Sequence, residues 1–144
     1  MKGRTRIILH GRKAFGGVAE GEALSTTRRL SGSMGGLQPT GEICERGHEL
    51  DGASFKGKIL VFPCSKGSTG WVIAFTKAAE NGNGPLALVT QTADTYTAQA
   101  AILTRTPMVV DLDADPCRVI ATGDWVRVDA DHGLVEIHKK NLQT

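Results

Sequence analysis

Residues 58–89 read KILVFPCSKGSTGWVIAFTKAAENGNGPLALV, and this stretch decides the fold. The run 58–63 is apolar after its first residue, as expected of a strand that is covered on both faces. Residues 71–81 then place apolar side chains at helical spacing, and the glycines and proline of 81–85 predict the end of that helix. Leu86–Val89 is a second buried strand. A strand, a helix and a second strand in this order predict two parallel strands joined by a right-handed crossover.

The segments on both sides extend this unit. Thr95–Leu103 is predicted to be a second helix and Met108–Val110 a third parallel strand. Alternating residues in 124–129 and 134–137, separated by a turn, predict an antiparallel hairpin. Near the start of the chain, 4–9 and 18–24 have strand character, and we expect them to pair as a hairpin. The sequence therefore predicts one mixed α/β domain, residues 1–144, with a small parallel α/β core packed on an antiparallel β-rich layer.

Composition narrows the classes of partner. The 144 residues carry 17 basic and 15 acidic side chains, a net charge of +2, which is too balanced for nucleic acid or an anionic membrane as the main partner. No long apolar run and no signal-peptide core is present, so we expect a cytoplasmic protein. The three cysteines lie far apart and form no metal-binding pair motif. They are idle thiols, or one of them is a metal or cluster ligand in a site shared with another chain.

The polar loop between the first predicted strand and helix, Cys64–Gly70, is the candidate for chemistry. Ser68 or Thr69 stands where a helix N-cap is expected, so one interpretation is a capping hydroxyl. Lys66 and Gly67 directly precede the free N–H groups of the helix, which instead predicts an anion site. The order of residues matches neither a Walker A loop nor a nucleophile elbow. A serine among backbone N–H donors can also act as a base without a histidine.

Three further features of the sequence have structural interpretations. The segment LSGSMGGLQPTG (30–41) holds four glycines and a proline, which excludes a helix and predicts a shaped loop. His48 lies in a polar segment and is expected to be exposed, and the four histidines lack the spacing of metal ligands. Trp71 and Trp125 occupy apolar positions of predicted elements, where we expect core side chains.

Several segments together carry a resemblance to a known family. In chain order these are GVAEGEAL (17–24), MGGLQPTGEI (34–43), FKGKILVFPCSKGSTG (55–70), GPLALV (84–89) and TPMVVDLDADPCRVIATGDWVRVDADHGLVEI (106–137). The chain resembles the small subunit, or swivelling domain, of the aconitase X family. The resemblance implies a swivelling β/β/α fold and a hydro-lyase activity shared with a separate large subunit, in a heterodimer or larger assembly. It also implies an iron ion or iron–sulfur cluster, mainly on the large subunit, as Lewis acid for the leaving hydroxyl.

The resemblance also suggests roles for the loop. In the wider superfamily this loop reads G-S-S-R-E-H, and its first serine, which falls on Ser68, is the base that removes a proton next to a carboxylate. Thr69 falls on the second serine as an oxyanion or substrate contact. Gly70 falls where the superfamily has its substrate-binding arginine, a departure that argues against a six-carbon tricarboxylate substrate. Lys66 supplies part of the missing charge, and Gly67 a backbone contact to substrate.

The resemblance and the sequence also assign roles to residues outside the loop Cys64–Gly70. The pair Gly35 and Gly36 resembles the family's glycines that close over the site, although a plain turn is an equal alternative. Cys117 or Cys64 is the candidate if this chain supplies a metal ligand. The uncharged loop Ser31–Gly36 and the exposed end of the Ser68 helix are expected to contact the large subunit, because such an elimination needs a closed site.

The resemblance leaves the substrate open between cis-3-hydroxy-L-proline and 5-phosphomevalonate. We favour the hydroxyproline reaction, because the sequence adds no basic residues for a phosphate ester beyond Lys66. In a different class of function, the chain is a non-catalytic module that binds an anionic metabolite and shares only the fold with the family.

Overall fold

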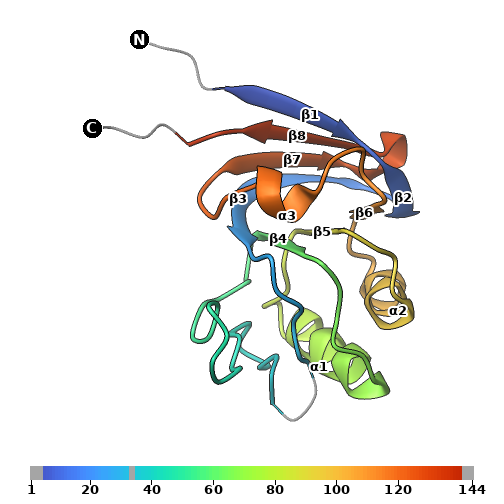
Figure 1. Ribbon diagram of the computed structural model, residues 1–144. Helices are drawn as coiled ribbons and strands as arrows, with labels where there is room; N and C mark the ends of the chain where they lie inside the picture. The colour runs from blue at the N-terminus through green and yellow to red at the C-terminus, as the bar shows by residue number, and fades with distance from the viewer. Residues whose placement is uncertain (1–4, 33–34, 141–144) are drawn as a thin grey trace.

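The computed structural model describes residues 5–32 and 35–140, and it is built in three layers. An antiparallel group of strands lies above a parallel group, and two helices with a long loop lie below (Figure 1). Ser33 and Met34, which belong to the predicted glycine-rich loop, fall outside the described residues. The order of layers is the β/β/α arrangement expected from the sequence, and the mixed α/β class is confirmed.

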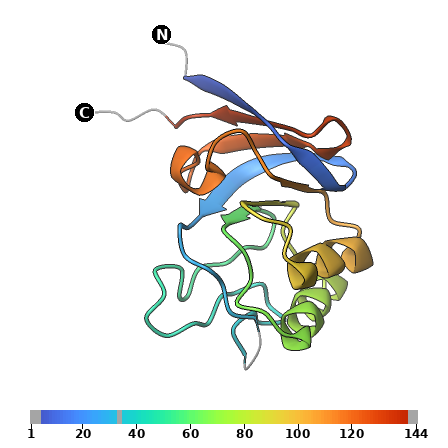
Figure 2. The ribbon, with the colours of Figure 1, turned by 45° about the vertical axis from the view of Figure 1, so that its right-hand side comes forward.

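The parallel group has the strand and helix order that residues 58–110 predict. It contains β4 (Ile59–Phe62), β5 (Ala87–Thr90) and β6 (Met108–Val110), paired in parallel in that order. The connections are α1 (Thr69–Glu80) and α2 (Thr95–Thr104), which lie together under the sheet (Figure 2). Every residue of the three strands is buried, because the second β layer covers the face opposite the helices.

The antiparallel group combines both ends of the chain. The predicted hairpin is β7 (Trp125–Asp129) and β8 (Leu134–His138), joined by the 3-10 turn η1 (Ala130–His132). Next to β8 lies β1 (Arg6–His10), and the short helix α3 (Pro116–Val119) precedes the hairpin.

The predicted pairing of 4–9 with 18–24 is wrong. The first strand, β1, pairs with β8, whereas β3 (Val18–Ser25) pairs with β7 and β4. Between them the chain forms β2 (Arg12–Phe15), which pairs antiparallel with β6. The chain therefore crosses from one strand group to the other after Gly11, so that β1 and β3 do not meet.

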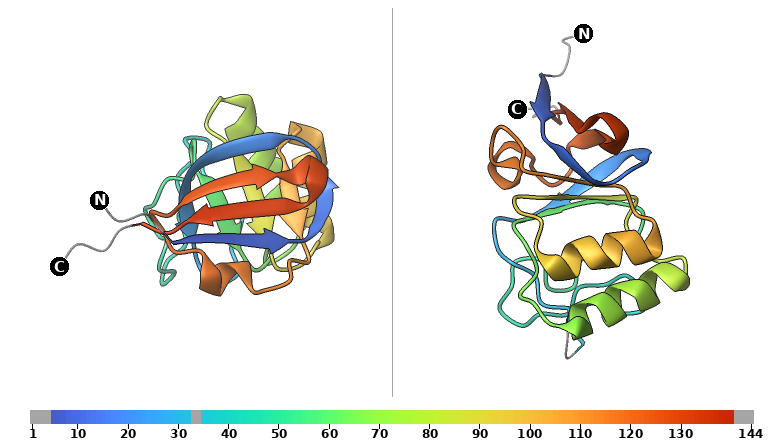
Figure 3. Two further views of the ribbon diagram at one scale, coloured as in Figure 1. Left: turned by 90° about the horizontal axis from the view of Figure 1, so that it is seen from above. Right: turned by 90° about the vertical axis from the view of Figure 1, so that its right-hand side faces the viewer.

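One strand belongs to both groups. Val18–Glu22 of β3 pair with β7, and Ala23–Ser25 of the same strand pair with β4. The eight strands therefore form one sheet in the order β1-β8-β7-β3-β4-β5-β6-β2, which folds back on itself (Figure 3).

Two apolar cores hold the layers together. The first lies between the two strand groups and contains residues of both, such as Val61 and Val126. The second lies between the parallel strands, the helices and the long connection 26–58, whose Leu30, Ile43 and Phe55 are buried in it. The connection is therefore anchored in this core at several points, although its described residues, 26–32 and 35–58, form no strand or helix of their own.

The carboxylate of the buried Asp124 accepts hydrogen bonds from Lys139 and Lys140, at the end of the described chain, and so holds these residues against the fold. Burial by itself would raise its pKa, but hydrogen bonds from Lys139 Nζ and from the backbone N–H groups of Lys140 and Ala121 hold the pKa below its ordinary value of 3.8. The carboxylate therefore stabilises the fold at neutral pH. This contribution is lost as the pH falls from the unfolded-state pKa through the lower folded-state pKa.

Asp124→Asn is expected to lower the free energy of unfolding at pH 7 by about 1–3 kcal/mol, because the buried network loses its negative charge and one of the two oxygens that accept its hydrogen bonds. It should also flatten the dependence of stability on pH below about 4, where the natural carboxylate becomes protonated. Urea unfolding across pH 2–7 measures both effects. Glu80→Gln is the control, because Glu80 is exposed. Equal acid sensitivity of Asp124→Asn and the natural chain would contradict the assignment.

No helix within residues 5–32 and 35–140 is long and apolar enough to cross a membrane.

Candidate functional site

Ser68 is the residue directly before α1, and its backbone is strained. Its φ of 84° and ψ of 152° lie in a region that glycine adopts but other residues rarely do. The residue is exposed, and its side chain makes no capping hydrogen bond to the helix. The interpretation of Ser68 as an ordinary helix cap is therefore not supported. Its hydroxyl stands beside the free N–H groups at the start of α1 without being used by them.

The residues around Ser68 have different environments. Thr69 and Gly70 are the first two residues of α1, with Thr69 exposed and Gly70 half-buried. Gly67 has a φ of 95°, so two consecutive residues adopt positive φ. Its backbone N–H donates to Ser65 Oγ at 3.1 Å, and a side chain on it would be in contact with the ring of Tyr96. The loop is thus a tight structure supported from α2.

Lys66 is paired with a carboxylate that the sequence did not indicate. Its ammonium group forms an ion pair with Glu45, whose other carboxylate oxygen accepts the backbone N–H of Ser31 at 2.8 Å. Burial by itself would raise the pKa of Glu45, but the hydrogen bonds from Lys66 and Ser31 and the charge of Lys66 lower it. The positive charge of Lys66 is therefore largely compensated within the chain. Glu45 also connects its own segment to the glycine-rich loop at Ser31 and to the loop Cys64–Gly70 at Lys66.

The glycine-rich loop lies against the start of α1. Leu30 is bridged to Ser65, and the Leu30 carbonyl accepts hydrogen bonds from Lys66 N at 2.8 Å and Trp71 Nε1 at 3.2 Å. A Cβ atom on Gly32 would lie 2.5 Å from Trp71 Cδ1, so only glycine allows this approach.

The pair Gly35 and Gly36 continues the same loop. Gly35 has a φ of 86°, and a Cβ atom on Gly36 would lie 2.4 Å from the carbonyl oxygen of Ser31. Both glycines are therefore required by the shape of the loop, which is a turn closely packed on itself. Whether the pair also closes over a substrate stays a prediction.

The cysteines do not assemble a metal site with other residues of the described chain. Within the described residues no three His, Cys, Asp or Glu side chains are placed to hold an ion. Burial raises the pKa of Cys117 to about 12, and it also raises the pKa of Cys64, with a further contribution from the charge of Asp94. Among residues 5–32 and 35–140, Cys64 and Cys117 therefore have no neighbouring ligands with which this chain could hold an iron ion or cluster by itself.

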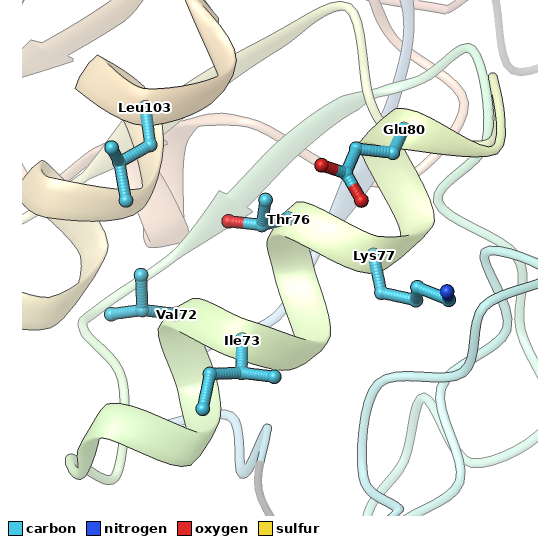
Figure 4. Close-up of a pocket in the computed structure, with 6 residues that line it drawn as sticks. All are labelled: Val72, Ile73, Thr76, Lys77, Glu80 and Leu103. Atoms are coloured by element: carbon cyan, nitrogen blue, oxygen red, sulfur yellow. The ribbon is translucent and has the colours of Figure 1, made fainter.

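A shallow groove lies apart from the Ser68 loop, between α1 and α2 (Figure 4). Its volume is about 280 Å³. Val72, Ile73 and Leu103 give it an apolar lining, and Lys77 and Glu80 lie farther along α1. None of the residues that the sequence assigns to the site lines it, so the groove is not part of the candidate site.

Comparisons with known proteins agree on one family. Residues 8–137 match the family described as the aconitase X swivel domain. The phosphomevalonate dehydratase small subunit of Thermococcus kodakarensis is 42% identical over 130 residues, which cover 90% of this chain and 95% of that protein. The protein of the same name from Methanocella arvoryzae is 37% identical over 130 residues, 90% of this chain and 98% of that protein.

A solved structure has the same fold. The crystal structure of aconitase X from Thermococcus kodakaraensis, in its holo-form, matches with a TM-score of 0.85 and 39% sequence identity, covering 92% of this chain and 99% of that chain. The likeness therefore extends over most of this chain and almost all of that chain.

Proposed function

The chain belongs to the aconitase X swivel-domain family, and from that premise we propose that it is the small subunit of a dehydratase that removes water from 5-phosphomevalonate. The names of the similar small subunits support this substrate. They favour it over the hydroxyproline reaction that the sequence suggested. That suggestion rested on the lack of extra basic residues, which is a weak criterion when a second subunit supplies half of the site.

Ser68 is the proposed base, and the observation that supports this role is its strained, exposed and uncapped position. A residue is held in such a conformation where the surrounding structure requires it, and this is a common property of reactive positions. The N–H groups at the start of α1 and the helix dipole stabilise negative charge on the serine oxygen. Ser68 would take a proton from the carbon next to the substrate carboxylate. The carbon–hydrogen electron pair would then form the carbon–carbon double bond as hydroxide leaves the adjacent carbon. The proton taken up by Ser68 balances this hydroxide, so that one water is released and the serine oxygen is again free to act as base.

The site would be completed by a separate large subunit. Ser68 and Thr69 are exposed, whereas an elimination of this kind requires a closed pocket. The loop Ser31–Gly36, of which Ser33 and Met34 lie outside the described residues, and the start of α1 are the surface that we assign to this contact. The iron or iron–sulfur group of the family is assigned to the large subunit, because the described residues of this chain do not fit one.

The substrate assignment is tested with the assembled enzyme. Mixed with its purified large subunit, the chain is expected to release water from 5-phosphomevalonate and to leave cis-3-hydroxy-L-proline unchanged, measured by product formation. Each subunit alone is the control and should be inactive. Turnover of hydroxyproline alone would reverse the assignment, and turnover of neither substrate by an intact complex would reject it.

A further inference from the structure

We propose that Asp94 is a positioning residue for Ser68 and that it acts through Ser65; this inference rests on the proposed function of Ser68. Asp94 is the N-cap residue of α2, and no sequence motif connects it with Ser68. Its carboxylate accepts three hydrogen bonds, from Ser65 Oγ at 2.6 Å, Ser65 N at 3.2 Å and Thr97 N at 3.1 Å. Two of the three therefore hold Ser65, the second residue of the loop Cys64–Gly70.

The connection continues from Ser65 to the residue before the serine. Ser65 Oγ accepts the backbone N–H of Gly67 at 3.1 Å. Asp94, Ser65 and Gly67 thus form an unbroken path that ends where the two consecutive positive φ angles begin. Ser65 is only 5% exposed, so water does not replace these bonds.

The charge of Asp94 fixes the direction of this path. An ionised carboxylate only accepts hydrogen bonds, so the Ser65 hydroxyl must donate to it. The lone pairs of Ser65 are then available for the Gly67 N–H. Each carboxylate oxygen of Asp94 accepts a backbone N–H, from Ser65 or from Thr97, so an amide at position 94 would point its NH2 group at one of these donors in either orientation. The carboxylate therefore selects the one arrangement that holds Gly67, and with it Ser68, in place.

Asp94 also caps α2, and this second role must be separated from the first. Ser65→Ala removes the bond to Gly67 but leaves Asp94 capping Thr97. Asp115 is a matched control, because its carboxylate caps α3 by accepting Cys117 N at 3.0 Å and pairs with Arg118, and neither partner belongs to the Ser68 loop. A cap by itself is worth about 1 kcal/mol of stability.

With the large subunit and 5-phosphomevalonate, Ser65→Ala and Asp94→Asn are expected to lower kcat ~10- to 100-fold, the effect of a small displacement of a reacting group, with KM changed less than kcat. Ser65→Thr keeps the hydroxyl and should restore most of the rate. Asp115→Asn should keep the natural kcat. Amide hydrogen exchange at Gly67 in the small subunit should become faster in Ser65→Ala.

The decisive measurement is the turnover of the double variant, in which Ser65→Ala is combined with Ser68→Ala. If Ser65 acts through Ser68, Ser65→Ala should not slow further the residual turnover of Ser68→Ala. An undiminished kcat in Ser65→Ala, or the same fold-loss in the Ser68→Ala background, would overturn the positioning role. Full activity of Ser68→Ala would instead reject the proposed base, so the two failures are distinct.

Discussion

Ser68→Ala, assembled with the large subunit, is expected to lose turnover ~10²- to 10⁴-fold, the range that a general base contributes. The methyl group retains the backbone position but offers no oxygen to accept the proton. Stability should change little, because the Ser68 hydroxyl makes no capping hydrogen bond that the change would remove. The measurements are steady-state kinetics of water elimination and urea unfolding of the same preparation.

Two variants control this result. Thr69→Ala removes the neighbouring hydroxyl and should cost much less turnover, because the proton-abstracting role is assigned to one residue. Ser68→Gly should be inactive and yet at least as stable as the natural chain, because glycine adopts a φ of 84° without the cost of about 1–3 kcal/mol that serine bears there. Full activity of Ser68→Ala would leave the loop as an anion site and remove the proposed mechanism.

Trp71→Ala is expected to lower the free energy of unfolding by about 3–5 kcal/mol, the cost of emptying a large buried aromatic position. Trp71 is fully buried and stacks on Phe62 and Phe75, with ring centroids 5.9 Å and 5.3 Å away. Its Nε1 donates to the Leu30 carbonyl, and Gly32 is packed against its ring. The cavity would therefore also loosen the loop beside Ser68. Urea unfolding measures the stability, and hydrogen exchange at residues 30–32 measures the loop.

Trp71→Phe is the matched control. It keeps most of the packing and removes the indole N–H, while the Leu30 carbonyl still accepts Lys66 N. We expect a loss of about 1–2 kcal/mol. If the alanine variant were no less stable than the phenylalanine variant, stacking of Trp71 would not be what holds the loop.

The fold was predictable from sequence where the signal is local. Apolar runs, helical spacing and the Gly/Pro segment 81–85 predict the parallel group correctly, and alternation predicts the β7–β8 hairpin. The choice of partner strand is not local, and this is why the pairing of β1 was wrong. The strand β2, RKAF, escaped prediction because four residues with little alternation carry no recognisable pattern.

The predicted burial of two single side chains, His48 and Trp125, was wrong for related reasons. His48 is buried and not exposed, because its two ring nitrogens bond the Arg29 carbonyl and the Leu50 N–H within a polar loop. Trp125 is 43% exposed and not core, because alternation shows that a strand has two faces but not which face is covered. Trp71, predicted from a helical pattern, is buried as expected.

The position of the candidate loop, between a strand and a helix, was predictable from the sequence, whereas the contacts that support the loop were not. The loop before α1 is visible in the sequence because strand, glycine and serine follow one another directly. Its supports are not: Ser65 meets Asp94 from 29 residues away, and Lys66 meets Glu45 from 21 residues away. No spacing rule connects such pairs, and the strain at Ser68 exists only in the folded chain.

The strand β3 is hydrogen-bonded to both strand groups, so the two groups are coupled and cannot move independently. Tilting the outer sheet against the helices would require breaking the backbone bonds that β3 forms with β7 or with β4. The strand β4, which β3 joins to the outer sheet, ends at Phe62, six residues before Ser68. A force applied to the outer sheet would therefore move the parallel strands with it, and the residues that follow β4 would change position together with the outer sheet.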